Sequence, residues 1–172
     1  MGVEEKVKQL AQDQRNKFWG KYRATVLEAL TGDDLGKLVV SAPDVFGTAP
    51  SPTVWPCVPF AGPSHGFFSI PEVGDGVWIE FEGGNPSQPI WTGCWWAAND
   101  LSSVSQANVR TWFTSKGMQI VMDDGQTQLS LIHPGGGTIV MTQTDITLAI
   151  GATQMKLNSS GISFTGNVTV GS

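Results

Sequence analysis

The chain has 172 residues with a formal charge of −5, and only 15% of the residues are charged. This length suits one or two small domains. The low charge and the 21 glycines favour β structure with tight turns over a helical bundle or a disordered tail. The net negative charge disfavours binding to nucleic-acid phosphates or to an anionic membrane surface.

Residues 1–20 are predicted to form a short helix. Apolar residues at Val3, Val7 and Leu10 are spaced as one helix face, and Gly20 ends the pattern. A solvated amphipathic helix and a docking arm both fit this segment. Because it has no apolar core of a secretory signal, we expect a protein made in the cytoplasm without a signal peptide.

Residues 21–96 are predicted to form a small closed β-barrel. Nine of the ten prolines lie between Pro43 and Pro89, so residues 43–63 are expected to be an irregular loop with one short strand. Alternation places Val77, Ile79 and Phe81 on one side of a strand. The expected strands, short runs separated by Gly and Pro, are 22–30, 35–41, 55–59, 76–82 and 89–96.

Residues 97–116 are predicted to be a polar connector, and residues 117–172 a ladder of short alternating strands with Gly-rich turns. The fifteen predicted core side chains of this ladder are Ile120, Met122, Leu129, Leu131, Ile139, Met141, Ile146, Leu148, Ile150, Met155, Leu157, Ile162, Phe164, Val168 and Val170. So few apolar side chains are not expected to offset the ordering of about 56 residues. The ladder is therefore expected to need other chains to close its core and cover its strand edges.

Four stretches of the chain resemble the central spike proteins of contractile tails, namely phage baseplate assembly protein V and the VgrG proteins of type VI secretion. The similar stretches are KLVVSAP at 37–43, SHGFFSIPEVGDGVWIEF at 64–81, GGNPSQPIWTG at 83–93 and KGMQIVMDD at 116–124. The motif residues within them are Pro71, Glu72, Val73, Gly74, Asp75, Pro86, Pro89 and Gly93. From the residues alone, Glu72 and Asp75 are expected to be turn residues without chemistry.

The resemblance implies an all-β chain with an OB-fold barrel at 21–96 and a β-helical or β-prism needle at 117–172, assembled as a homotrimer. It implies a structural spike of a phage tail baseplate or related injection particle. The barrel would dock on a central hub protein, and the needle would contact the target membrane only during injection. Since the sequence lacks the His-x-His tip motif of some spikes, we expect a separate PAAR-type protein to cap the C-terminal end.

No catalytic, cofactor or metal site is predicted. Glu80 and Glu82 share a strand face, but that is common on an exposed barrel surface, and the sequence has no G-x-S-x-G motif. The Asp123-Asp124-Gly125 segment lacks the remaining ligands of a calcium loop. The two cysteines, Cys57 and Cys94, are predicted to be ordinary buried thiols.

The alternative function is an OB-fold binding module for a saccharide or another ligand. Trp78, Trp91, Trp95 and Trp96 could supply stacking surfaces for such a ligand. Nucleic acid is disfavoured, because no Lys or Arg occurs between Lys37 and Arg110.

Overall fold

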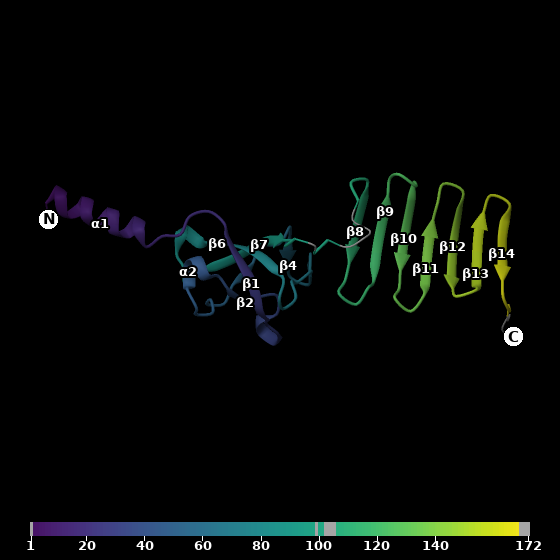
Figure 1. Ribbon diagram of the computed structural model, residues 1–172, viewed down its shortest axis with the longest axis horizontal. Coiled ribbons are helices and arrows are strands. Elements are labelled where there is room, and N and C mark those ends of the chain that lie inside the picture. Colours follow the sequence, from purple (N-terminus) through teal and green to yellow (C-terminus); the bar gives the residue numbers. More distant parts are fainter. Residues whose placement is uncertain (1, 99, 102–105, 169–172) are drawn as a thin grey trace. The chain divides into compact units, whose positions relative to one another are not determined.

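The chain forms two compact units, residues 1–100 and residues 101–172 (Figure 1). The structure is a computed structural model and describes residues 2–98, 100–101 and 106–168.

The first unit begins with helix α1 (Val3–Arg15) and continues as a small β structure with three further short helical segments. The prediction of an N-terminal helix is confirmed. The strands are β1 (Tyr22–Ala29), β2 (Leu38–Ser41), β3 (Trp55–Pro56), β4 (Ala61–Gly62), β5 (His65–Gly66), β6 (Gly76–Phe81) and β7 (Pro89–Trp95). The helical segments are η1 (Gly32–Asp34), α2 (Pro43–Phe46) and η2 (Glu82–Gly84).

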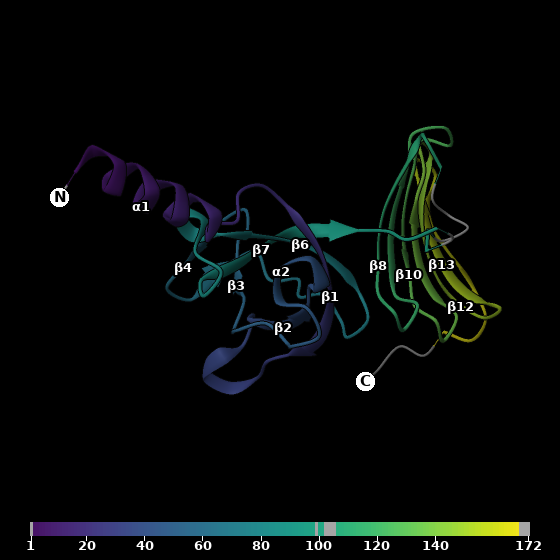
Figure 2. The same ribbon diagram turned by 60° about the vertical axis from the view of Figure 1, so that its left-hand side comes forward.

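Five of these strands form a curled sheet in the order β2-β1-β6-β7-β3, with β3 parallel to β7. An antiparallel bridge between Leu38 and Val54 ties the two edges of the sheet together. Figure 2 shows the curled sheet from a second direction. The hairpin β4–β5 forms a separate two-stranded sheet.

Alternation in β6 builds the core as predicted: Val77 and Ile79 are fully buried, and Phe81 is nearly so. Phe81 contacts the rings of Phe18, Tyr22 and Phe46 at centroid distances of 5.7–6.1 Å. These rings close one end of the core. The remaining core side chains, which are also buried, are Ala24, Val26, Leu38, Val40, Ala42, Val54 and Trp91.

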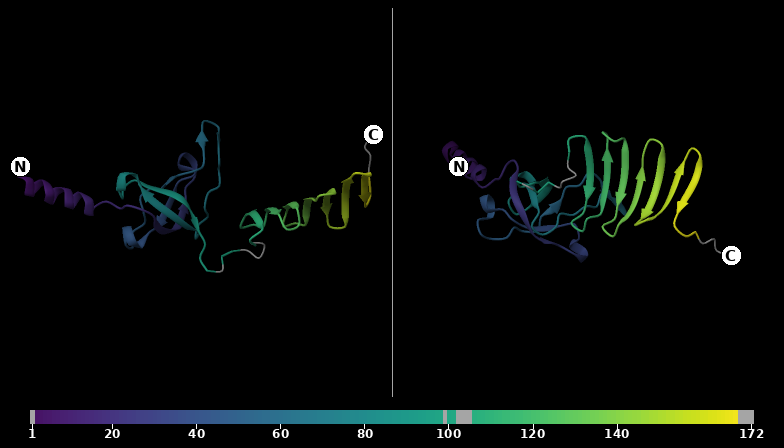
Figure 3. Two further views of the ribbon diagram at one scale, coloured as in Figure 1. Left: turned by 90° about the horizontal axis from the view of Figure 1, so that it is seen from above. Right: turned by 45° about the vertical axis from the view of Figure 1, so that its right-hand side comes forward.

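The second unit is a seven-stranded antiparallel sheet in which every strand pairs with its neighbour in the sequence. Its strands are β8 (Val109–Phe113), β9 (Gln119–Asp123), β10 (Gln128–Ile132), β11 (Gly137–Met141), β12 (Asp145–Ile150), β13 (Thr153–Asn158) and β14 (Gly161–Thr165). Figure 3 shows these strands as one layer. A single chain therefore forms an open meander, and not the coils of a β-helix.

Two features of this unit differ from the sequence-based prediction. Strand β8 lies inside the segment 97–116 that was expected to be a connector. The strand was not predicted because Arg110 stands where the other strands of the sheet have an apolar residue. Val168 follows β14 and is not part of a strand, while Val170 lies outside the described residues.

Candidate interaction surface

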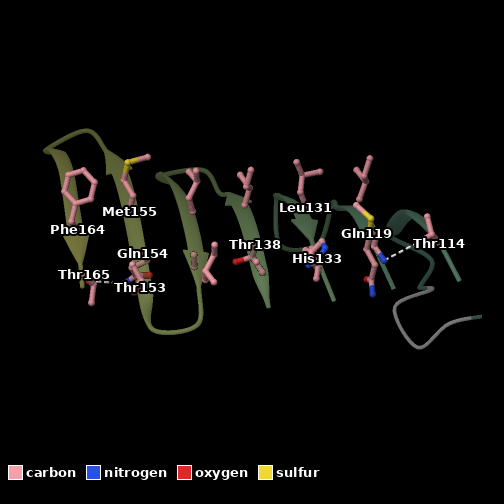
Figure 4. A pocket seen from close by; sticks show the side chains of 18 of the residues that line it. Thr114, Gln119, Leu131, His133, Thr138, Thr153, Gln154, Met155, Phe164 and Thr165 are labelled. Carbon is pink, nitrogen blue, oxygen red and sulfur yellow. Dashed lines mark hydrogen bonds between the residues drawn. The ribbon is translucent and has the colours of Figure 1, made fainter. Parts of the chain in front are cut away.

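Register aligns one side chain from each strand of the second unit in a single row. Cross-strand partners share a face of a sheet, so these seven side chains lie on the same side. We call them the central row: Trp112, Ile120, Leu131, Ile139, Leu148, Met155 and Phe164. Figure 4 shows Leu131, Met155 and Phe164 in line across the sheet.

A second row lies two residues away along each strand, on the same face. It comprises Arg110, Met122, Leu129, Met141, Ile146, Leu157 and Ile162. The face that carries the two rows is called the apolar face. Thirteen of the fifteen predicted core side chains lie in strands, and all thirteen, including Ile150, are on this face.

The apolar face is open to solvent in the single chain. Leu148 is 38% exposed and Ile150 is 72% exposed, whereas a core side chain such as Val77 is fully buried. The face encloses a shallow hollow of about 780 Å³ lined by side chains of all seven strands. A contiguous apolar surface of this kind marks an interaction site in a soluble protein.

Sequence reasoning missed one member of the central row, Trp112, which is 54% exposed. Its register partner is Ile120, which places it at the β8 end of the row. The available signal was the run of strand-forming residues Val109, Thr111 and Phe113, whereas Arg110 takes the place of an apolar residue on the face of Trp112.

The opposite face carries a mainly polar row: Thr111, Val121, Ser130, Val140, Thr147, Lys156 and Ser163. Lys156 pairs with Asp145 across β12 and β13, with 3.0 Å between Nζ and Oδ2. The hydrogen bond from Lys156, aided by its positive charge and by Thr144 and Thr147, lowers the pKa of Asp145 below its usual value. The sheet is thus amphipathic, with one apolar and one mainly polar face.

In the barrel, the motif Pro71–Asp75 forms a tight turn between the loop and β6. The Asp75 carboxylate accepts a 2.8 Å hydrogen bond from the backbone N–H of Glu72. Gly74 has φ of +97°, which favours glycine, and its N–H donates to the carbonyl of Val26. The contacts of Asp75 are those of a turn residue, in line with the sequence-based interpretation.

The other motif residues shape the β6–β7 hairpin. Pro89 is fully buried at the start of β7, and Pro86 lies in the preceding turn. Gly93 has φ of +144° at a register shift, where Trp78 pairs with Gly93 and Ile79 with Trp91. Glycine is therefore required at a bulge that changes the direction of the side chains that follow.

The four candidate tryptophans do not form one stacking surface. Trp91 is buried in the core and donates from Nε1 to the carbonyl of Gly36. Trp78 and Trp95 both contact the guanidinium of Arg23, at 5.4 Å and 5.1 Å from the ring centroids. Trp96 is exposed. The predicted platform therefore loses Trp91 to the core, and Trp78 and Trp95 are half-buried beside Arg23.

Both cysteines are exposed, so the prediction of buried thiols is wrong. Cys57 follows the short strand β3, and Cys94 lies near the end of β7, beyond the register shift at Gly93. Partial burial of the Cys94 thiol, and then the negative charge of Asp75, raise the pKa of Cys94 above its usual value.

Neither a metal cluster nor a membrane-spanning helix is found in the part of the chain that the structure describes. Among those residues, no three His, Cys, Asp or Glu side chains lie together as a metal site. None of the described helices combines the length and the apolar character needed to cross a bilayer.

Comparison with known proteins identifies the barrel. No curated protein sequence matches the chain. Residues 22–96, which span β1 to the end of β7, match the family described as the type VI secretion system/phage-baseplate injector OB domain. The barrel at residues 22–96 is therefore similar to the OB domains of type VI secretion and phage-baseplate injectors.

Proposed function

We propose that the chain is a homotrimeric structural spike of a phage tail baseplate or a related contractile injection apparatus. The match of residues 22–96 to the injector OB domain supports a baseplate-related structural role. The observation that carries the finer proposal is the apolar face, on which the central row and the second row stay exposed in the single chain.

Three copies can cover this face by turning it inward. Each copy then presents its mainly polar row to solvent, and the apolar side chains of the three sheets form a common core. Interfaces of this kind, with an apolar centre and a polar outer surface, are typical of obligate oligomers. The ion pair of Asp145 and Lys156 lies on the polar face, which would be the outer face of such a trimer. Neither charge would therefore enter the apolar core.

The expected partners follow from this assembly. The OB domain docks on a central hub protein, and a PAAR-type protein binds at the β14 end of the needle. In this proposal the needle contacts the target membrane only when the sheath contracts. The supporting observation for a partner at β14 is that this edge strand has the sequence GISFT, without the charge or proline that commonly protects an exposed edge.

The trimer is tested by measuring the mass of the full chain in solution by light scattering. We expect about 55 kDa, three times the chain mass of 18.4 kDa. Leu148→Glu would bring three carboxylates into the apolar core and is expected to prevent the trimer from forming. Ser163→Glu is the matched control, because Ser163 lies opposite Lys156 on the polar side.

Two results would contradict the proposal. A wild-type chain that is monomeric at micromolar concentration has no trimer core. A Leu148→Glu variant that keeps the trimeric mass places the interface on another surface of the molecule.

A further inference from the structure

A cleft of about 350 Å³ lies on the barrel, lined by Trp55, Glu82, Ser87, Gln88 and Pro89. Its volume falls at the lower end of the range for small-ligand sites. The cleft brings β3 beside the turn between β6 and β7, about thirty residues away in the chain. None of its lining residues belongs to the apolar face or to the cluster of Trp78, Arg23 and Trp95.

Backbone contacts on both sides hold Trp55 in place. Val54 and Leu38 exchange two hydrogen bonds of 3.0 Å and 2.8 Å, and Trp55 pairs with Ile90 of β7. The ammonium of Lys37 lies 3.8 Å from the centroid of the indole ring. Trp55 is still 55% exposed, so an aromatic surface remains for a ligand.

The polar wall of the cleft is a turn with several internal hydrogen bonds. Glu82 N–H donates to the carbonyl of Gln88 at 3.1 Å, and Gln88 N–H donates to the carbonyl of Asn85 at 2.9 Å. The side chain of Asn85 accepts from Ser87 N–H and donates to Gln88 Oε1. The hydrogen bonds fix the backbone of this turn, which carries the Glu82 carboxylate, the Ser87 hydroxyl and the Gln88 amide N–H₂ group at the cleft.

We propose that this cleft binds a neutral saccharide. A pyranose ring presents one apolar C–H face, which can stack on Trp55, and hydroxyl groups at its edge. These hydroxyls can donate to the Glu82 carboxylate and accept from the Gln88 amide. Few placed polar groups beside an aromatic surface are the usual composition of a small-ligand site.

The charges at the cleft select against an anionic ligand. Glu82 has no ion-pair partner among the described residues, so its negative charge repels a phosphate, sulfate or uronate group. The cation nearest to Trp55, Lys37, is paired with Asp34 at 2.7 Å. A phosphate-bearing nucleic acid is therefore the wrong class of ligand for this site.

Saturation-transfer NMR on the full chain tests the proposal with chitotriose, cellotriose and maltotriose at concentrations up to about 10 mM. We expect saturable binding of at least one of these oligosaccharides. Trp55→Ala is expected to weaken it roughly tenfold or more, since aromatic anchors dominate binding energy. Glu82→Gln is expected to weaken it several-fold without changing the fold, because Glu82 is exposed.

The matched control is Trp96→Ala, which removes another exposed tryptophan that does not line the cleft. It should leave the affinity unchanged. Oligothymidylate serves as the nucleic-acid probe in the same experiment. The proposal is overturned if none of the three sugars binds the wild-type chain, whether or not oligothymidylate binds. It is also overturned if the Trp55→Ala and Glu82→Gln variants both bind the sugars as tightly as the wild-type chain does. None of these results depends on whether the chain forms a trimer.

Discussion

The indole of Trp95 covers Gly76 so closely that a Cβ atom at position 76 would lie 2.5 Å from Cε2 of the ring. Gly76 pairs with Trp95 at the start of β6, and Trp95 donates from Nε1 to the carbonyl of Val77. This glycine thus creates the space in which Trp95 packs, and Arg23 lies against the same ring.

Gly76→Ala is therefore expected to lower the free energy of unfolding of the barrel by about 1–3 kcal/mol, the usual range for overpacking. Because the ring must move, the change should also alter tryptophan fluorescence. Urea denaturation followed by fluorescence measures both effects. An unchanged midpoint and spectrum would show that Trp95 does not depend on the space above Gly76.

Phe81→Ala is expected to cost about 3–5 kcal/mol, the usual range for a buried phenylalanine. Phe81 is 7% exposed and contacts three other aromatic rings. The matched control is Phe68→Ala, which removes a phenylalanine that is 64% exposed and should change stability by no more than about 0.5 kcal/mol. Equal losses in the two variants would contradict the assigned core.

The pKa of the Cys94 thiol is expected to fall in Asp75→Asn, because a neutral amide no longer disfavours the thiolate. Burial is the larger cause of the raised pKa, so the value should remain above the usual one. The pH dependence of iodoacetamide alkylation measures it. Cys57 is exposed as well, so the experiment uses a Cys57→Ser background. An alkylation profile that Asp75→Asn does not shift would show that this charge does not act on Cys94.

The pKa of Asp145 is expected to rise toward its usual value in Lys156→Met, because the largest cause of its lowering is removed. A carboxyl with a lowered folded-state pKa stabilises the fold above its unfolded-state pKa, and this contribution is lost as the pH falls through the folded value. The stability difference between wild type and Lys156→Met should therefore shrink on acidification. NMR titration of the Asp145 carboxyl checks the pKa, and Lys116→Met is the control. A larger difference at low pH would reverse the assigned sign.

Strands with regular alternation could be predicted from sequence. Val77, Ile79 and Phe81 point inward as expected, and the predicted strand residues of the ladder lie on one face because each repeat keeps an alternation of two. Segments without such periodicity could not be predicted in the same way. Helix α2 was missed because it is four residues long and lies in the proline-rich stretch.

Side-chain exposure was harder to predict where it depends on backbone irregularities. The register of β7 shifts at Gly93, and no alternation pattern in the sequence reveals that shift. Trp91 was proposed as a stacking surface, yet strand pairing places it in the core. The cleft at Trp55 joins residues distant in sequence, and therefore no local motif could indicate it.

The length of the sheet in the second unit depends on the number of its hairpins. Each strand is bonded only to its sequence neighbours, so adding or deleting one hairpin leaves every other pairing intact. Neighbouring strands are about 4.8 Å apart, and one hairpin therefore changes the reach of the sheet by roughly 10 Å. Chains with this architecture can therefore diverge in the length of the sheet by duplication of one hairpin, without any change to the central row or the second row of the other strands.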